Sequence, residues 1–197
     1  MIRKLQGLSE EELQKIRLLV GEAFVSNELF HNWGTEEERR GDVLKYMAVY
    51  VDFAYGAGEL YANEDMTGFI GLEDSREKKI GPQMKMLFKL FTTIPFYRIK
   101  QLMKFINVIG EGNKQYANKP HIDVLMVCVD RSHQGKGIAR ELVTFAKDMS
   151  DSRGVPLLID TDMKSYAQMY EHMGCEIYNE IKADNGVTRY NLCYRGS

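Results

Sequence analysis

The hydrophobic positions in the N-terminal region follow the spacing of a helix. Ser9 and Glu12 stand just before them as a capping box, in which each side chain accepts a hydrogen bond from the backbone N–H of the other residue. Residues 2–5 are expected to form a short strand before this helix. The apolar residues that recur every three or four positions, and so share one helix face, are Leu13, Ile16, Leu19, Val20, Ala23 and Phe24.

A second helix is expected to begin after another capping box, formed by Thr35 and Glu38. Gly56 and Gly58 are expected to end it, because glycine disfavours the helix interior and is common just after a helix. Its apolar side carries Tyr46, Met47, Tyr50, Val51 and Ala54.

Short apolar runs bounded by turn residues predict the strands of a sheet. Residues 59–62 and 68–72 flank a polar turn and are expected to form an antiparallel hairpin. Residues 122–129 are an apolar and β-branched run typical of a buried strand, and residues 157–159 are another. Two final strands are expected around Asp184-Asn185-Gly186, since Asn-Gly favours tight hairpin turns.

Helices are expected between the later strands. Pro95 divides its region into two helices, since proline disfavours helical geometry at the preceding residue and is well suited to the start of a helix. An amphipathic helix is expected from Ile138 to about Gly154. The apolar face of the last helix carries Tyr166, Met169, Tyr170 and Met173.

The composition narrows the classes of protein to which this chain can belong. With 197 residues, of which 44% are hydrophobic, it is long enough to bury a substantial core. We therefore expect one α/β domain with a mixed sheet over residues 1–197. The 26 basic and 28 acidic side chains give a net charge of −2, which argues against a nucleic-acid partner.

The cysteines indicate a reducing compartment. Cys128, Cys175 and Cys193 lie far apart and form no Cys-x-x-Cys pair, so neither a disulfide framework nor a metal site is expected. The N-terminus lacks an apolar signal core, and no run approaches the roughly 20 apolar residues that a membrane span needs. We expect a soluble, cytoplasmic protein without a membrane partner.

One segment departs from the balanced charge. Residues 82–110 carry five basic side chains and no acidic one, so this helical insertion is +5 and the rest of the chain is −7. Three interpretations stay open: a solvated face, a surface that binds membranes, or a lid that favours an anionic acceptor or the CoA phosphates. The lid hypothesis depends on Lys85 and Lys89.

Residues 127–140 predict a buried strand that turns through glycines directly into a helix. Gly135 and Gly137 would let the backbone approach a ligand closely, and the first N–H groups of a helix lack internal partners and can bind a phosphate. Lys136 and Arg140 add positive charge. The alternative is an ordinary strand-to-helix turn. Walker and dinucleotide-binding loops do not fit, because the required Ser or Thr and the third glycine are absent.

Two motifs in this region match a known family. Gln134-Gly135-Lys136-Gly137-Ile138-Ala139 fits a coenzyme A signature of Arg or Gln, two residues, Gly, one residue, then Gly or Ala. Farther along, a strand and a helix lead to Tyr170 and Gly174, which fit a second signature, Tyr-x-x-x-Gly. Over residues 122–178 the chain therefore resembles the Gcn5-related N-acetyltransferase (GNAT) superfamily.

The resemblance implies a mixed, largely antiparallel sheet flanked by helices, in which parallel strands 122–129 and 157–161 splay apart around acetyl-CoA. It also implies that backbone groups of Val127 and Val129 pair with pantetheine and that N–H groups of residues 135–139 hold the pyrophosphate. The cofactor-binding residues that it implies are Val127, Val129, Gln134, Gly135, Lys136, Gly137, Ile138, Ala139 and Arg140.

The resemblance also implies a role for Tyr170 as proton donor to the leaving thiolate, whereas helical spacing alone predicts a core aromatic. His121 and Asp123 alternate along the chain, so either could face the acceptor and take its ammonium proton through water. The alternatives are a loop position for His121 after Pro120 and a lysine-paired carboxylate for Asp123.

The function that the resemblance implies is acetyl-CoA-dependent transfer of an acetyl group to a primary amine of a small molecule or protein, by direct attack on the thioester. The family pattern is broken at Met163, where an Asn is common, and at Cys175, where a Phe is usual. A non-catalytic acyl-CoA-binding module of the same fold is therefore the alternative. A homodimer would fit the resemblance.

Overall fold

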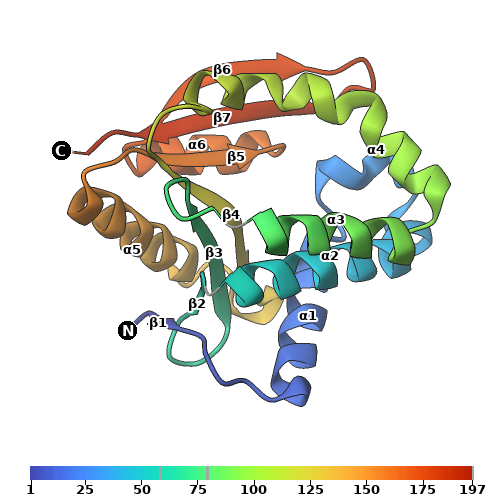
Figure 1. The fold of residues 1–197 in the computed structure, drawn as a ribbon, viewed down its shortest axis with the longest axis horizontal. Coiled ribbons are helices and arrows are strands. Elements are labelled where there is room, and N and C mark those ends of the chain that lie inside the picture. The colour runs from blue at the N-terminus through green and yellow to red at the C-terminus, as the bar shows by residue number, and fades with distance from the viewer. Residues whose placement is uncertain (58, 79, 197) are drawn as a thin grey trace.

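The computed structural model describes residues 1–57, 59–78 and 80–196 and is built on a seven-stranded sheet in the order β1-β2-β3-β4-β5-β7-β6 (Figure 1). Neighbouring strands are antiparallel except β4 and β5, which are parallel. The predicted mixed, largely antiparallel sheet is therefore confirmed. The strands are β1 (Arg3–Lys4), β2 (Leu60–Ala62), β3 (Gly68–Asp74), β4 (Ile122–Val129), β5 (Leu157–Thr161), β6 (Glu176–Lys182) and β7 (Thr188–Tyr194).

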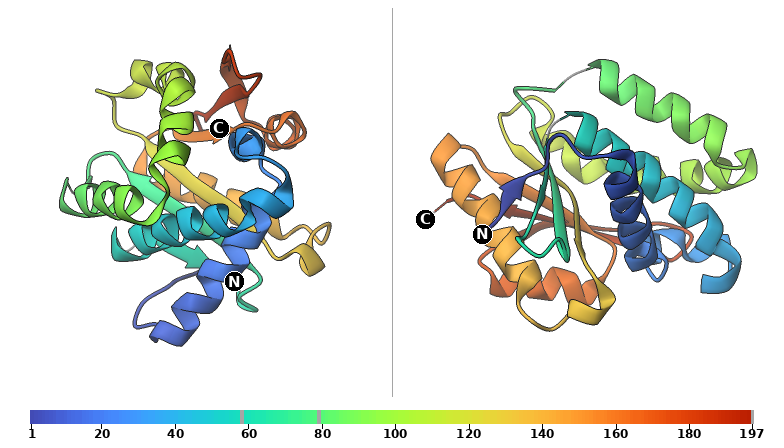
Figure 2. Two further views of the ribbon diagram at one scale, coloured as in Figure 1. Left: turned by 90° about the vertical axis from the view of Figure 1, so that its right-hand side faces the viewer. Right: turned by 90° about the horizontal axis from the view of Figure 1, so that it is seen from below.

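Helices cover both faces of the sheet (Figure 1, Figure 2). Phe69 of β3 enters a core formed with α1, α2 and α4, and Ile70 enters a second core formed with α5 and α6. Adjacent strand residues point to opposite faces, so one strand serves both cores. The helices are α1 (Glu10–Phe24), α2 (Glu36–Ala57), α3 (Ile80–Thr93), α4 (Phe96–Ile109), α5 (Ile138–Arg153) and α6 (Lys164–His172), with short 3-10 helices η1 (Glu28–Trp33), η2 (Glu111–Tyr116) and η3 (Arg131–His133).

Both N-terminal helices begin at the predicted capping boxes. The Ser9 hydroxyl oxygen accepts from the N–H of Glu12 at 3.2 Å, and the N–H of Ser9 donates to the Glu12 carboxylate at 2.8 Å. The same two bonds join Thr35 and Glu38 at 3.3 and 2.8 Å. Local sequence therefore defines where both helices start.

Turn residues end most elements as predicted. The pairs β2–β3 and β6–β7 are antiparallel, and Pro95 separates α3 from α4. α5 ends at Gly154, whose φ of 63° is left-handed. α2 differs, because it continues through Gly56 to Ala57; Gly58, the second glycine expected to end it, lies outside the described residues.

The hydrophobic pattern does not predict η1 and η2. In η1, Phe30 and Trp33 are buried with their ring centroids 5.0 Å apart. In η2, Gly112 lies against β6 and β7, where a Cβ would overlap the side chains of Asn179 and Asn191. Such short 3-10 helices are too brief to show a sequence period, so tertiary contacts define them.

A glycine lets α5 pack closely on the start of β3. A Cβ on Gly68 would overlap Cγ2 of Ile138, the first residue of α5, and would lie 3.2 Å from Cδ1 of Leu142. The absence of a side chain at Gly68 therefore determines how closely the N-terminal end of α5 approaches the sheet.

We expect Gly68→Ala to lower the free energy of unfolding by about 1–3 kcal/mol, which is the usual cost of overpacking a core. Urea denaturation measures this loss. Gly71→Ala, in the same strand, is a matched control, since its Cβ would meet its nearest atoms at 3.4 Å, an ordinary contact. Equal losses in the two variants would contradict the close packing of α5 on Gly68.

The helices α3 and α4 lie between β3 and β4 in the sequence, although these two strands are paired. α3 runs along the side of α2 that faces away from the sheet (Figure 2). α4 approaches η1, η2 and β6. Among the described helices, none combines the length and the apolar character needed to cross a membrane.

Candidate active site

Strands β4 and β5 pair only over their first residues. The parallel pairing runs from Ile122 opposite Leu157 to Val124 opposite Ile159, and the described residues show no further pairing between these strands. On its other side, β4 stays paired with β3 to its end. From Leu125 onward, the edge of β4 that faces β5 is therefore open, as the splayed pair in the predicted fold requires.

A β-bulge interrupts β4 where this opening begins. Gly71 of β3 is opposite Met126 and Leu72 is opposite Val124, so Leu125 has no partner across the ladder. An extra residue of this kind disrupts the regular alternation along the strand and bends it. The bulge was not predicted from the sequence.

Because of the bulge, the backbone of Val127 and Val129 faces the opening. Before it, the N–H of Ile122 donates toward β5 at 2.9 Å; after it, the N–H of Asp130 donates to the other side, at the start of β3, at 2.8 Å. In a regular strand these two groups would point the same way. Backbone groups of successive residues alternate between the two edges of a strand. The N–H and C=O groups of Val127 and Val129 therefore point away from β3, toward the side of β5.

The glycine loop after η3 presents free backbone donors. Gly135 and Gly137 have φ values of 76° and 83°, which favour glycine, and a Cβ on either would meet no atom within 4 Å. In the part of the chain that the structure describes, the N–H groups from Gly135 to Arg140 have no acceptor. Lys136 and Arg140 are exposed at this positive end of α5.

Side chains tie the loop to the end of β4. Nε2 of Gln134 donates to the carbonyl oxygen of Val129 at 3.3 Å. The hydroxyl and the N–H of Ser132 donate to Asp130 at 2.7 and 2.8 Å, and these hydrogen bonds lower the pKa of Asp130. Gln134, predicted to bind the cofactor, thus contacts the strand in this structure and holds the loop in place.

A cleft of about 540 Å³ lies where β4 and β5 separate. Its walls come from α2, η2, α6 and the two strands. Tyr170, Asp123 and His121, the three residues predicted as catalytic, all line it together with Val127. Val129, the last residue of β4, and the glycine loop that follows η3 lie outside its lining.

The ring of Tyr170 belongs both to the core and to the cleft. The residue is 6% exposed and packs in the core between α5, α6 and the sheet, as its helical spacing predicts. Its hydroxyl has no hydrogen-bond partner among the described residues, and the residue lines the cleft. Burial raises the pKa of Tyr170, so the hydroxyl keeps its proton at neutral pH.

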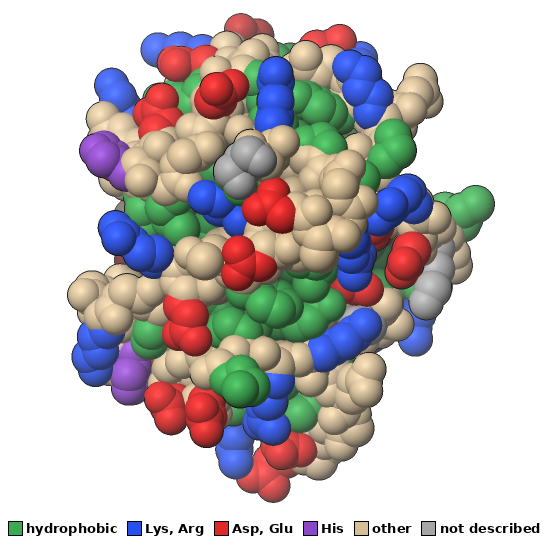
Figure 3. Space-filling model, turned by 90° about the vertical axis from the view of Figure 1, so that its left-hand side faces the viewer, with side chains coloured by type: hydrophobic (Ala, Val, Ile, Leu, Met, Phe, Trp, Pro, Cys, Tyr) green, Lys and Arg blue, Asp and Glu red, His purple; other side chains and the backbone are tan. Residues whose placement is uncertain are grey.

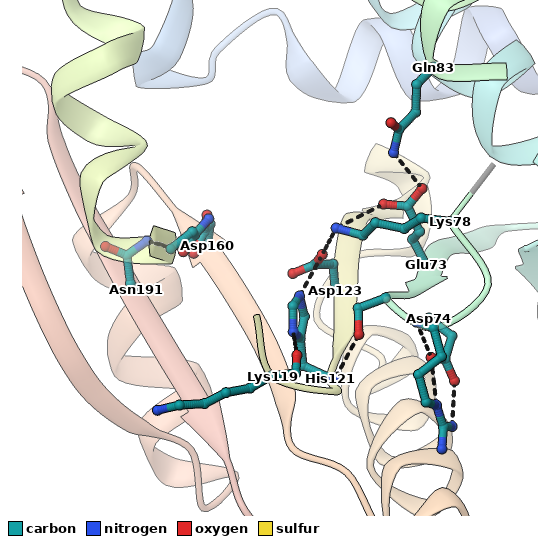
Figure 4. Close-up of polar contacts among 12 residues, drawn as sticks. Glu73, Asp74, Lys78, Gln83, Lys119, His121, Asp123, Asp160 and Asn191 are labelled. Carbon is teal, nitrogen blue, oxygen red and sulfur yellow. Dashed lines mark hydrogen bonds and ion pairs between the residues drawn. The ribbon is translucent and has the colours of Figure 1, made fainter. Parts of the chain in front are cut away.

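His121, Asp123 and Lys78 form a row on one wall of the cleft (Figure 4). Nδ1 of His121 lies 2.6 Å from the carbonyl oxygen of Lys119, so it is the nitrogen that carries the proton in the neutral ring. Nε2 lies 3.2 Å from Oδ2 of Asp123, and Nζ of Lys78 donates to the same oxygen at 3.1 Å. The lysine-paired alternative for Asp123 is thus present in the structure, and His121 precedes β4 rather than lying on it.

The row shifts the pKa values of its members. The hydrogen bond to Asp123 raises the pKa of His121 above its usual 6.5. Burial alone would raise the pKa of Asp123, but the hydrogen bond from His121 and the charge of Lys78 lower it overall. Near neutral pH, Asp123 is therefore an anion that faces the cleft, and His121 titrates at a higher pH than a free histidine.

Residues 92–176, which include β4, the glycine loop and α6, match a family model described as an acetyltransferase (GNAT) domain. This match identifies a GNAT acetyltransferase domain in that part of the chain. Comparison with curated protein sequences gives no match.

Solved structures share the GNAT fold with this chain at low sequence identity. One is a Corynebacterium glutamicum protein described as 'histone acetyltransferase HPA2 and related acetyltransferase'. It is 14% identical, with a TM-score of 0.65, and the match covers 100% of this chain and 96% of that one. An N-acetyltransferase from Staphylococcus aureus is 16% identical, with a TM-score of 0.57 and 98% and 100% coverage. The NatC complex bound to Gag peptide and CoA is 13% identical, with a TM-score of 0.54 and 100% and 98% coverage.

Part of the cleft lining is a polar cluster that was not predicted from the sequence. Asp160 of β5 accepts from Nδ2 of Asn113 at 2.6 Å and from Nδ2 of Asn191 at 2.7 Å. Arg189 of β7 holds Asp162 through two hydrogen bonds of 2.7 and 2.9 Å. These side chains come from separate elements, so only the fold brings them together. The one sequence feature that indicates close packing at this cluster is Gly112, next to Asn113, because a Cβ on Gly112 would overlap the side chain of Asn191.

The two departures from the GNAT pattern have visible consequences. Met163 precedes α6 without a side-chain hydrogen bond to the helix, where Asn could cap it. Cys175 is buried, and burial raises the pKa of its thiol to about 11, so it stays protonated. Neither residue supplies a polar side chain to the cleft.

The lid hypothesis for the basic segment is not supported. Lys85 and Lys89 of α3 line a separate open hollow that also includes Asp52 of α2, rather than the cleft. Nζ of Lys89 is 2.9 Å from Oδ2 of Asp52 and forms an ion pair with it. The loop between β3 and α3 brings Lys78 to the cleft instead.

Proposed function

We propose that this GNAT protein transfers the acetyl group of acetyl-CoA to a primary amine of a small molecule or protein. The row of free N–H groups at the start of α5, which continues the open edge of β4, carries the proposal. Such a row suits a pyrophosphate, and an open strand edge suits the amide groups of pantetheine. The NatC complex, which shares this fold, was solved with CoA bound, in keeping with this cosubstrate.

Successive parts of coenzyme A are proposed to bind along residues 127–140. The N–H groups of residues 135–139 would hold the pyrophosphate, with Lys136 and Arg140 adding charge. The backbone of Val127 and the N–H of Val129 would pair with pantetheine, while the carbonyl of Val129 is engaged by Gln134. Acetyl-CoA supplies an activated acetyl thioester. A free N–H of β4 would polarise the thioester carbonyl at this edge, as in an oxyanion site.

Tyr170 is the proposed donor to the leaving sulfur. Its raised pKa keeps the hydroxyl protonated, and its free O–H lines the cleft. Transfer of the proton from a tyrosine to a thiolate is uphill by at least about 2 kcal/mol, from ordinary pKa values near 10 and 8.5. The proposed contribution is therefore a hydrogen bond to the developing thiolate.

Asp123 and His121 are proposed to prepare the amine. The Asp123 carboxylate would attract the acceptor ammonium into the cleft. Neutral His121, with its proton on Nδ1, presents the lone pair of Nε2 beside Asp123 and can take the ammonium proton directly or through water. His121 is the better base of the two, since the pKa of Asp123 is lowered.

The pH profile is expected to report this base. The pKa of His121 is raised, and the residue accepts a proton only after losing its own, so kcat/KM should rise as the pH increases through a value above 6.5. Asp123→Asn removes the largest cause of the shift and should move this acid limb to lower pH. Steady-state kinetics across the neutral range measures both profiles.

A histidine outside the cleft lining provides the control for that experiment. His172 is an exposed residue of α6 that hydrogen-bonds to the backbone of its own helix. His172→Gln should leave the acid limb where it is. An acid limb that stays in place in Asp123→Asn would remove His121 from the role of base.

A non-catalytic acyl-CoA-binding module is the second candidate, favoured by the apolar Met163 and by the contacts that occupy both ring nitrogens of His121. Release of CoA in the presence of a panel of primary amines separates the two functions. Acetyl transfer predicts CoA release that depends on at least one amine, with the acetylated amine detected by mass spectrometry. Tight CoA binding without turnover of any amine would favour the module.

A further inference from the structure

The outward side of α3 is an apolar stripe. The stripe consists of Met84, Leu87, Phe88 and Phe91. Apart from the adjacent pair Leu87 and Phe88, neighbouring members lie three or four positions apart, so all four share one helix face. Phe88 is 70% exposed and Phe91 is 54% exposed. The opposite side of α3, which includes the buried Leu90, packs toward α2. This helix thus has two apolar faces, of which only one is covered.

More exposed aromatic side chains lie at the start of α4. Phe96 is 72% exposed and Tyr97 is also exposed, just after the Pro95 turn that joins the helices. The two helices lie at the outer side of the molecule (Figure 2). Exposed aromatic side chains at this density are unusual for a surface that faces only water. We call Met84, Leu87, Phe88, Phe91, Phe96 and Tyr97 the outer face.

The charges on these helices have one sign. Lys85, Lys100 and Lys104 are exposed and have no carboxylate partner in the described ranges. The two other basic residues of the segment are neutralised, since Lys89 pairs with Asp52 and Arg98 with an aspartate of α2. The side of the molecule that carries α5 differs, because Lys and Arg alternate there with Asp and Glu (Figure 3).

We propose that the outer face docks on an anionic membrane surface. Apolar and aromatic side chains would enter the boundary between headgroups and acyl chains, and Lys85, Lys100 and Lys104 would contact lipid phosphates. A second copy of the chain is a poorer occupant, because pairing the outer faces would bring lysines of both copies together without acids between them. This inference is independent of acetyl transfer.

Vesicle co-sedimentation tests the proposal with the full chain. The wild type should bind phosphatidylcholine vesicles that contain phosphatidylserine, bind vesicles of phosphatidylcholine alone much more weakly, and lose binding as NaCl is raised. Failure to bind the anionic vesicles at low salt would overturn the proposal. Equal binding to both vesicles would remove the role assigned to the lysines and overturn it as stated.

Substitutions assign the binding to the outer face. Phe88→Asp with Phe91→Asp should lower the vesicle partition coefficient at least about 10-fold. Leu18→Asp is the matched control, because Leu18 is a 50% exposed apolar residue on α1. Circular dichroism and CoA affinity, expected to match wild type, show that the variants are folded. An unchanged partition coefficient in the double variant would overturn the assignment.

The lysines are tested separately. Replacing Lys85, Lys100 and Lys104 with Gln should lower the partition coefficient about 5-fold for each lysine. Lys45→Gln is the control, since Lys45 is exposed on α2 outside this segment.

Sedimentation velocity without vesicles tests the competing possibility, that the outer face joins two copies of the chain. A wild-type dimer that Phe88→Asp with Phe91→Asp converts to a monomer would make the outer face an interface between copies and overturn membrane docking.

Discussion

Replacing Gly137 with glutamate is expected to weaken CoA binding at least about 100-fold, which corresponds to about 2.7 kcal/mol. Gly137 has a φ of 83° and precedes α5, where the free N–H groups of the loop converge. A glutamate adds strain from the left-handed backbone, a side chain in the space needed by the ligand, and a negative charge beside a pyrophosphate. Isothermal titration calorimetry with CoA measures the loss.

Gly7→Glu is the control that separates the effect of the position in the glycine loop from the effect of backbone strain. Gly7 also has a positive φ, 65°, and a Cβ there would meet no atom within 4 Å, but it lies between β1 and α1. This variant should lose stability through the same strain and keep its CoA affinity. Retained affinity in Gly137→Glu would show that the glycine loop is not the pyrophosphate site.

Tyr170→Phe should lower kcat about 100-fold, the lower end of the range for loss of a positioned acid, and leave the Kd for CoA nearly unchanged. The substitution removes only the hydroxyl, which has no partner in the described part of the chain, so the core around the ring should keep its packing. Turnover assays and calorimetry on the same preparation separate the two effects.

Tyr166→Phe provides the matched control on the same helix. Tyr166 also lines the cleft, but it is exposed, whereas Tyr170 is buried. Loss of its hydroxyl should change kcat much less. Equal effects of the two substitutions, or an unchanged kcat in Tyr170→Phe, would mean that Tyr170 serves only as a core aromatic.

Local signals predicted much of the fold correctly. The Ser9–Glu12 and Thr35–Glu38 capping boxes, the hairpin at Asn185 and the helix start after the glycine loop are all defined by residues close in sequence. In each case, the hydrogen bonds involved are formed within a few residues. The same holds for β4, in which every residue except Asp123 is apolar and none is exposed.

Features that depend on distant contacts were not predicted. The bulge at Leu125 arises from the register of β3 against β4, and nothing in either strand alone marks it. The Asp160 cluster needs β5, β7 and η2 side by side. The row from Lys78 to His121 joins a loop after β3 to the start of β4. Sequence spacing identified His121 and Asp123 as neighbours but could not identify Lys78 as their partner.

The small net charge of the whole chain conceals the basic segment at residues 82–110. The position of Pro95 correctly predicted two helices in this segment. The sequence alone could not tell which apolar residues face α2 and which face solvent, because α3 is apolar on both sides. The structure distinguishes the buried Leu90 from the exposed Phe88 and Phe91, and this distinction is the basis for the docking proposal.

The most direct measurement of the central claim is a crystal structure of the protein with CoA. We expect pyrophosphate oxygens within about 3 Å of the N–H groups of residues 135–139, and pantetheine along Val127 and Val129 with its sulfur directed toward Tyr170. CoA bound elsewhere, or with its pyrophosphate away from the start of α5, would contradict the assignment of this site.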